Sequence, residues 1–300
     1  FIVGFAVAVI LFEGGMNLRL SRIRREGKTI RQLITTGALV TALGGTVTAK
    51  VFLGWDWRIS LLFGVIVIVT GPTVITPLLR RLKLRRSVST VLEAEGVLLD
   101  AIGAVIAVVA LEIALSPSGL SFLTGLFHII TRLIVGSAIG AAGGFLLAFL
   151  LRFRNLVPEG LENVFTLSLV FALFQGANSI SPESGIVAVT AAGLVVGNMK
   201  THVQRELREF EEQMTVLLIG MLFILLAADV RLIEVTELGW GGIITVVILV
   251  CVLRPLNVYI GTMGTNLNLR QKALLSWIAP RGIVAAAVAS LFALELEKHG

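Results

Sequence analysis

Asp100 is the residue whose type and position point most directly to chemistry. It lies inside the apolar run Val97–Val109, and the chain has only two other aspartates, Asp56 and Asp229. A carboxylate at the centre of a membrane helix costs roughly 2.5–3.5 kcal/mol on insertion scales, so such residues usually serve a function. The simplest reversible chemistry of a lone carboxylate is to exchange a proton for a cation.

Other charged residues in apolar surroundings are expected to support Asp100. Glu95 precedes it by five positions, which is about 140° around a helix, so Glu95 is better placed to anchor a neighbouring helix than to duplicate Asp100. A buried arginine keeps its proton and needs a carboxylate partner, and Arg281 is the obvious counter-charge for Glu95. Arg254 is explained either by a salt bridge or by a lipid head group. Glu13 either lies at the interface or lines the cytoplasmic funnel.

Proline and glycine interrupt two apolar stretches near their middles. Thr70, Gly71 and Pro72 form the first break, and Pro280 marks the second. Proline removes a backbone hydrogen bond and clashes with the preceding turn. Unwound carbonyls and half-helix ends can coordinate a cation. The two breaks therefore predict an ion site that includes Asp100.

The elements that must position these residues are membrane helices. Apolar residues make up 56% of the chain, its mean hydropathy is +0.94, and 15% of its residues are charged, against about 25% in a soluble domain. Backbone groups in lipid must be paired within each segment, so we predict an all-α polytopic helical bundle. The ten candidate spans are 1–18, 30–53, 59–79, 88–115, 122–151, 161–178, 183–198, 214–229, 239–263 and 271–296.

The charge distribution orients the bundle and argues against nucleic acid as a partner. The net charge of +6 is concentrated in alternate loops, which is the positive-inside pattern. The basic loops are predicted to be cytoplasmic, with residue 1 at the outer face; the family resemblance described below adds a bacterial plasma membrane as the expected location. The hydrophilic stretch Met199–Gln213 is predicted to be a solvated connector, with a short surface helix as the alternative. Cys251 is alone, which excludes an internal disulfide.

A weak internal repeat relates the two halves of the chain. Residues Ile10–Leu20 resemble Ile224–Leu232, and a broken helix follows each copy after about fifty residues. The loop charges give the two copies opposite directions across the membrane. Inverted repeats with interrupted helices are typical of secondary transporters that bind their substrate at the midplane.

Signatures of catalysis are poor. The three histidines, His128, His202 and His299, lack metal-ligand spacing, and the sequence contains no Gly-x-Ser-x-Gly and no phosphate loop. We therefore predict neither an enzyme nor a bound cofactor. A channel, or a carrier of another solute, stays open as an alternative to an exchanger.

Four segments resemble one family, the monovalent cation/proton antiporters, in the branch that holds bacterial sodium/proton antiporters and animal sodium/hydrogen exchangers. They are Phe12-Glu13-Gly14, Thr70-Gly71-Pro72, Glu93–Asp100 and Ala279–Val284. The resemblance runs over nearly the whole chain. It implies about thirteen spans in the full family fold, of which roughly two would precede Phe1 and one would follow Gly300.

By position, the resemblance implies a role for each candidate residue. Asp100 would bind the ion and the proton, and Thr70 would help to coordinate the monovalent cation. Glu95 and Arg281 would form a charge pair that bridges two crossed, interrupted helices. Glu13 would line the cytoplasmic access path.

The resemblance also implies an organisation and a transport reaction. Residues 30–115 and 239–300 would form a moving core, 1–29 and 161–238 a dimerising scaffold, and 122–151 a linking helix. The expected activity is exchange of protons for sodium by a homodimer in lipid, with potassium as the alternative ion. The family usually has Asn-Asp where this chain has Leu99-Asp100. It usually has Thr-Asp-Pro where this chain has Thr70-Gly71-Pro72, so Gly71 replaces the aspartate. A single acid predicts one proton per cation and electroneutral exchange.

Overall fold

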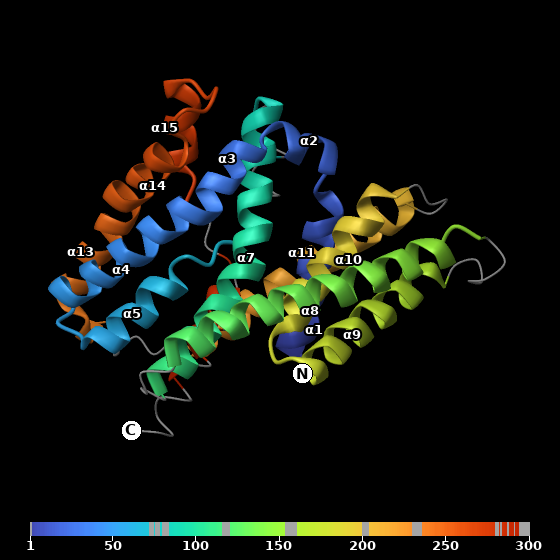
Figure 1. Ribbon diagram of the computed structural model, residues 1–300, viewed down its shortest axis with the longest axis horizontal. Coiled ribbons are helices and arrows are strands. Elements are labelled where there is room, and N and C mark those ends of the chain that lie inside the picture. The colour runs from blue at the N-terminus through green and yellow to red at the C-terminus, as the bar shows by residue number, and fades with distance from the viewer. Residues whose placement is uncertain are drawn as a thin grey trace. The chain divides into compact units, whose positions relative to one another are not determined.

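The chain is built from helices. A computed structural model describes residues 2–71, 75, 79, 84–115, 121–153, 161–199, 204–229, 236–279, 282, 284–286, 288–290 and 292–293. Every regular element within these residues is an α-helix or a short π-helical segment (Figure 1). The predicted all-α class is therefore confirmed.

The helices follow the apolar stretches of the sequence closely. Five of them are long and apolar enough to cross a membrane, because about 20 apolar residues span the hydrocarbon. The elements of the first half are α1 (Ile2–Asn17), α2 (Leu20–Arg25), α3 (Gly27–Gln32), η1 (Leu33–Gly37), α4 (Ala38–Phe52), α5 (Trp57–Ile66), α7 (Arg86–Leu115) and α8 (Ser121–Leu150). Those of the second half are α9 (Glu162–Ile180), α10 (Ser184–Asn198), α11 (Gln204–Asp229), α13 (Gly239–Ile248), η2 (Leu249–Leu253), α14 (Arg254–Gly261) and α15 (Leu269–Trp277).

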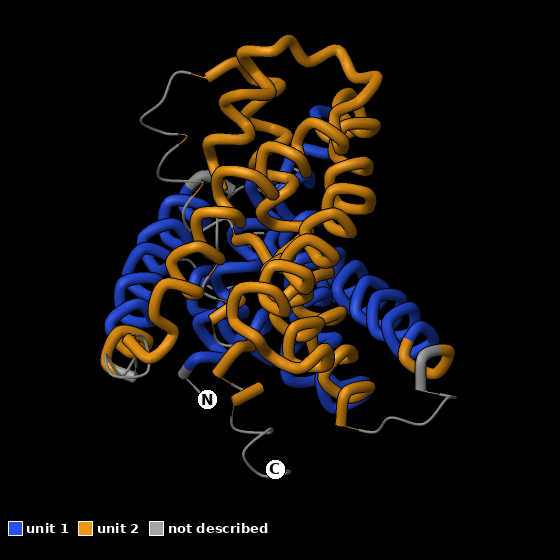
Figure 2. The backbone as a smooth tube through the Cα atoms, turned by 90° about the vertical axis from the view of Figure 1, so that its left-hand side faces the viewer, with its two compact units in different colours: residues 1–22, 126–224 blue, residues 23–125, 225–300 orange. Residues whose placement is uncertain are grey.

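The chain divides into two compact units, each formed by two separate parts of the sequence. Unit 1 comprises 1–22 and 126–224, and unit 2 comprises 23–125 and 225–300 (Figure 2). Most of α8 belongs to unit 1. The assignment of a moving core, a dimerising scaffold and a linking helix stays a prediction.

Unit 1 is held together by close helix contacts at small residues. Gly193 and Gly197 of α10 lie directly against the backbone of Phe12 and Met16 in α1, and a Cβ atom on either glycine would clash there. Small residues allow the backbones of membrane helices to approach closely, which is a main source of helix association in lipid. This packing fixes the C-terminal end of α1, which carries Glu13.

In unit 2, each of two long helices contains a π-helical segment. η1 continues into α4 and packs against α14, while η2 precedes α14 and packs against α4. The sequence predicted membrane spans at 30–53 and 239–263 and did not predict either π-helical segment. A π segment inserts one extra residue in a turn and is frequent at functional sites. Arg254, the first residue of α14, directly follows η2 and is buried inside unit 2.

Two helices end where the sequence predicted breaks. α5, capped at its N-terminus by Asp56, ends at Ile66, and residues 69–71 have no regular structure. α15 ends at Trp277, and Ile278 is extended. Pro72 and Pro280, which were predicted to cause the breaks, lie outside the described residues.

One predicted boundary is wrong. The stretch 199–213 was predicted to be a solvated connector, with a short surface helix as the alternative. Instead α11 begins at Gln204 and continues without interruption into the predicted span 214–229. Glu211 within it is completely buried. The run of charges suggested solvent, whereas the charged residues are distributed over several faces of one helix.

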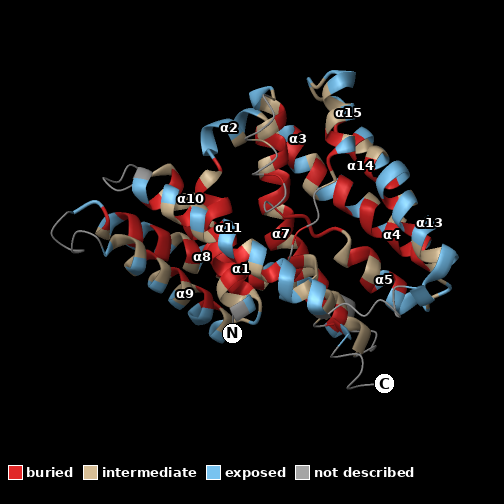
Figure 3. Cartoon of the chain, turned by 180° about the vertical axis from the view of Figure 1, so that it is seen from behind, coloured by how far each residue is buried: buried red, intermediate tan, exposed pale blue. Residues whose placement is uncertain are grey.

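The outward faces of the long helices are apolar. Phe127 and Ile134 of α8, Ile224 of α11 and Val246 of α13 are all more than half exposed, and exposed positions recur along these helices in Figure 3. Large exposed apolar surfaces mark contact with a membrane or a partner. Together with the apolar helix lengths, they indicate faces that contact lipid.

Candidate ion-binding site

The long helix α7 carries both central carboxylates of unit 2. Glu95 and Asp100 are each 0% exposed to solvent. Because they point about 140° apart around the helix, their side chains enter different surroundings. Glu95 meets an arginine, and Asp100 meets the two chain interruptions.

The two interruptions come together at Asp100. A Cβ atom placed on Gly282 would lie 2.7 Å from the Cα of Gly71 and 3.1 Å from Oδ1 of Asp100. A Cβ atom placed on Gly71 would lie 3.4 Å from Oδ2 of Asp100. The carboxylate therefore lies against both glycines. The breaks after α5 and α15, more than 200 positions apart in sequence, meet at one acidic side chain.

The carboxylate of Asp100 is buried and uncompensated in the part of the chain that the structure describes. Neither of its oxygens has a hydrogen-bond partner there. A buried ionised carboxylate without a partner is expensive, by several kcal/mol even after relaxation. Such a group is poised to bind a positive charge, either a proton or a cation.

Thr70 lies between the first break and α7. Its hydroxyl is buried and donates a hydrogen bond of 3.3 Å to the main-chain carbonyl oxygen of Glu95. This bond ties the unwound segment to α7 one residue before Gly71. The predicted part of Thr70 in cation coordination stays a prediction.

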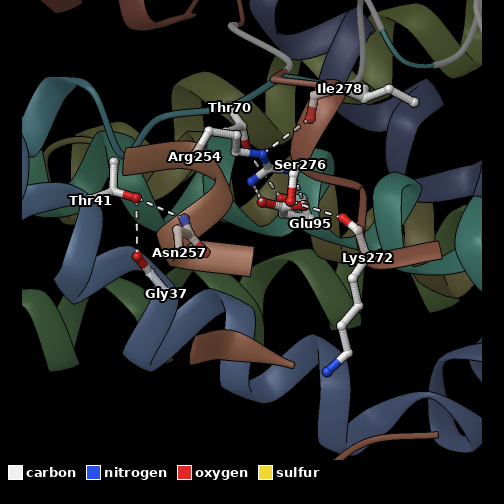
Figure 4. A network of polar contacts seen from close by, with 9 residues as sticks. All are labelled: Gly37, Thr41, Thr70, Glu95, Arg254, Asn257, Lys272, Ser276 and Ile278. Carbon is white, nitrogen blue, oxygen red and sulfur yellow. Dashed lines mark hydrogen bonds and ion pairs between the residues drawn. The ribbon is translucent and has the colours of Figure 1, made fainter. Parts of the chain in front are cut away.

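Glu95 forms a bidentate salt bridge with Arg254 (Figure 4). Nη1 of Arg254 donates to Oε1 of Glu95, and Nη2 donates to Oε2 over 3.0 Å. Nε of Arg254 donates to the carbonyl oxygen of Ile278, over 3.1 Å, where the chain leaves α15. One guanidinium therefore joins α7, α14 and the second interruption. Bidentate pairs of this kind fix geometry as well as contributing energy.

The sequence assigned a different partner to Glu95. Arg281 was expected to bind it, and Arg281 lies outside the described residues, so that pairing stays a prediction. Both oxygens of the Glu95 carboxylate are occupied by Arg254. The only signal in the sequence was an arginine deep in an apolar span, which was compatible with a salt bridge or with a lipid head group.

A small cavity with both polar and apolar lining residues adjoins the salt bridge. The volume that the centre of a water molecule can occupy in this cavity is about 10 Å³, which is enough for on the order of one water. Thr70, Leu99 and Asn257 are among its lining residues. Nδ2 of Asn257 donates to the hydroxyl of Thr41 over 2.7 Å. These contacts connect α4 to α14 beside the ion site, as Figure 4 shows.

Glu13 lies in unit 1. It is 3% exposed, and the side-chain amide of Asn17 donates to it. Of the two alternatives for Glu13, a half-exposed interfacial carboxylate does not fit this burial, and a place in the access path stays a prediction. Glu211, which no pattern in the sequence singled out, is buried in the same unit and interacts electrostatically with Glu13.

Comparison with known proteins gives a consistent result. A family model described as sodium/hydrogen exchanger, transmembrane, matches residues 1–299. The chain is 23% identical to the Na(+)/H(+) antiporter NhaH of Halobacillus aidingensis over 96% of its own length and 73% of that protein. It is 28% identical to the K(+)/H(+) antiporter NhaP2 of Shewanella oneidensis over 93% of its length and 49% of that protein.

A solved structure shares the fold. The sodium proton antiporter MjNhaP1 of Methanocaldococcus jannaschii superposes with a TM-score of 0.81 at 24% sequence identity. The alignment covers 99% of this chain and 76% of that one.

Proposed function

This chain belongs to the transmembrane sodium/hydrogen exchanger family, and we propose on that premise that it exchanges protons for a monovalent cation by alternating access. One observation carries the proposal. The carboxylate of Asp100 is completely buried, has no partner among the described residues, and lies where two interrupted helices meet.

The proposed exchange follows from charge. An ionised Asp100 attracts one positive charge, because a desolvated carboxylate is costly when it is left alone. A proton and a cation compete for it, since either one neutralises the site. Main-chain carbonyls of the unwound segments after α5 and α15 are the groups that would complete the coordination of the cation.

Glu95 and Arg254 position the site without neutralising it. Their charges cancel each other, so Asp100 keeps its own charge to be balanced by the transported ion. Through its bond to the carbonyl oxygen of Ile278, Arg254 holds the second interruption against α7. The pair is thus a structural support for Asp100 rather than a competitor for the ion.

The proposed stoichiometry is one proton for each cation. Leu99, beside Asp100, is buried and apolar, so it contributes no second charge. Electroneutral exchange is insensitive to the roughly 2.3 kcal/mol per charge that 100 mV supplies. A gradient of one pH unit would drive it with about 1.4 kcal/mol.

The proposal is tested with Asp100→Asn in proteoliposomes. Asparagine keeps the shape of the protonated acid but cannot exchange a proton, so cation-driven proton flux should fall to the level of empty liposomes. Glu112→Gln is the matched control, because Glu112 is an exposed acid on the same helix, and it should exchange normally. Exchange that survives in Asp100→Asn would refute the role of Asp100. Flux that responds strongly to an imposed voltage would refute electroneutrality.

Sodium is the ion we propose first, with potassium as the alternative. NhaH is named for sodium and NhaP2 for potassium, and both resemble this chain over most of its length. Flux measured with sodium, lithium and potassium in turn decides between them. We further propose a homodimer in the bacterial plasma membrane, with the basic loops in the cytoplasm and with residues 30–115 and 239–300 as the moving core.

A further inference from the structure

Asn257 of α14 is a buried amide that contacts α4 and η1 with both ends of its side chain (Figure 4). Its Nδ2 donates to the hydroxyl of Thr41 over 2.7 Å, and that hydroxyl donates to the carbonyl oxygen of Gly37 over 3.1 Å. Its Oδ1 lies against Gly37, where a Cβ atom would clash with it. Because the hydrogen of Thr41 is already used, the amide must present its nitrogen to Thr41 and its oxygen to Gly37.

The two helices that meet at Asn257 are built alike. η1 and η2 are π-helical segments of 5 residues that begin with a leucine, and each leads directly into an α-helix. Thr41 and Asn257 are 216 positions apart, and each comes one helical turn after the end of its π segment. The repeat found in the sequence has nearly the same spacing. The two π-containing helices therefore touch through a matched pair of residues.

A second contact between these helices also depends on a glycine. Leu253, the last residue of η2, packs onto Gly44 of α4, where a Cβ atom would clash with its side chain. Small residues let membrane helices approach closely. Gly37 and Gly44 thus receive Asn257 and Leu253 at two separate points. Two separate contacts fix α14 both along α4 and around its own axis.

The rotation of α14 decides where Arg254 points. Arg254 lies three residues before Asn257, on the same side of the helix. Its guanidinium binds Glu95 of α7 and the carbonyl oxygen of Ile278, where the chain leaves α15. Both residues of α14, with Glu95 and Thr41, line the same small cavity. A rotation of α14 would therefore move the guanidinium relative to both of its partners.

We propose that Asn257 is a positioning residue of the exchange site, which acts through Arg254. It holds α14 on α4 so that one guanidinium reaches Glu95 and the second interruption together. The consequence for transport rests on the proposed exchange activity. A cation needs several oxygens to replace its hydration shell, whereas a proton needs only the carboxylate of Asp100. Displacing the second interruption should therefore weaken cation binding more than proton binding.

Transport by two variants in proteoliposomes tests this consequence. Asn257→Leu keeps the side-chain volume and removes the amide. The cation concentration for half-maximal exchange should rise by roughly threefold to tenfold, which is about the contribution of one hydrogen bond, while the maximal rate is kept. Thr41→Val breaks the same hydrogen bond but leaves Oδ1 of Asn257 against Gly37, so its increase should be smaller. Thr245→Val is the control, because this buried threonine donates within its own helix, and it should change nothing.

The transport result separates positioning from simple support of the fold. If Asn257→Leu is less stable than the unchanged protein but needs the same cation concentration for half-maximal exchange, Asn257 only supports the fold and the proposal is overturned. If Asn257→Leu does not fold, Thr41→Val takes its place in both experiments, and an unchanged cation concentration in that variant overturns the proposal in the same way.

Thermal unfolding in detergent tests the link to Arg254 without transport. Arg254→Met should lower the melting midpoint by less in the Asn257→Leu background than in the unchanged chain, because there the guanidinium is already displaced. In the Thr245→Val background it should keep its full effect. Additive shifts for Asn257 and Arg254 overturn the proposal. If the unchanged protein exchanges no ions, the proposed function fails, while the melting series still decides whether Asn257 positions Arg254.

Discussion

Replacing Arg254 with methionine should destabilise the protein strongly. Methionine retains much of the side-chain volume but leaves Glu95 as a buried carboxylate with neither of its two guanidinium hydrogen bonds. Removing one partner of a buried ion pair typically costs 3–5 kcal/mol. The carbonyl oxygen of Ile278 also loses its donor, which adds about 1–3 kcal/mol where no water replaces it. We expect a total loss of at least about 3 kcal/mol, because the two effects share one side chain and do not simply add.

Unfolding of the detergent-solubilised protein measures this loss. Arg270→Met serves as the control, because Arg270 is exposed and an exposed charge contributes little. Glu95→Gln combined with Arg254→Met should recover much of the stability, since the double variant no longer buries a charge. Where unfolding is irreversible, the order of the melting midpoints replaces the free energies.

The reasoning is refuted if Arg254→Met melts together with Arg270→Met. A parallel double-mutant cycle of Glu95 with Arg281 tests the pairing that the sequence predicted. A larger coupling energy in that cycle than in the cycle with Arg254 would show that Glu95 depends chiefly on Arg281.

Two further predictions follow from the ends of the interrupted helices. Gly282→Ala should cost about 1–3 kcal/mol of stability and slow exchange, because its Cβ would lie 2.7 Å from the Cα of Gly71, beside Asp100. Gly220→Ala is the control, because a Cβ at Gly220 would have nothing within 4 Å. Equal exchange rates in the two variants would contradict the close approach. The pKa of Asp56 lies below its usual value, because the main-chain N–H groups of Arg58 and Trp57 donate to its carboxylate. The cap of α5 is therefore present at neutral pH and lost as the pH falls below about 4. Below that pH, hydrogen exchange at the first turn of α5 should accelerate, and it should accelerate less in Asp56→Asn than in the unchanged protein. An equal acceleration in the two proteins would refute the capping role.

The sequence was informative where one segment decides its own structure. Helix positions followed from apolar stretches of membrane length, and the ends of α5 and α15 fell near the Pro and Gly clusters. The arrival of both breaks at Asp100 was predicted from inverted repeats and from the family resemblance. Each of these inferences needs only local physics or a pattern that the chain repeats.

The remaining features depend on contacts between distant parts of the chain. Glu95 and Arg254 are 159 positions apart, and an apolar span with one arginine does not reveal which carboxylate it meets. Glu211 stands among several other charged residues in the sequence, so nothing local marked it as buried. The π segments η1 and η2 depend on packing between α4 and α14, and no residue type marks them.

The difference between the two carboxylates of α7 is itself an argument about function. Glu95 and Asp100 lie on one helix, in one unit, and both are fully buried. The fold supplies Glu95 with a bidentate arginine, whereas Asp100 has no partner among the described residues and has a glycine from each interruption beside it. A permanent arginine beside Asp100 would stabilise the fold. It would, however, already provide the positive charge that the transported ion must bring. The uncompensated acid is therefore the one suited to exchange, and the compensated acid is the one suited to hold the helices in place.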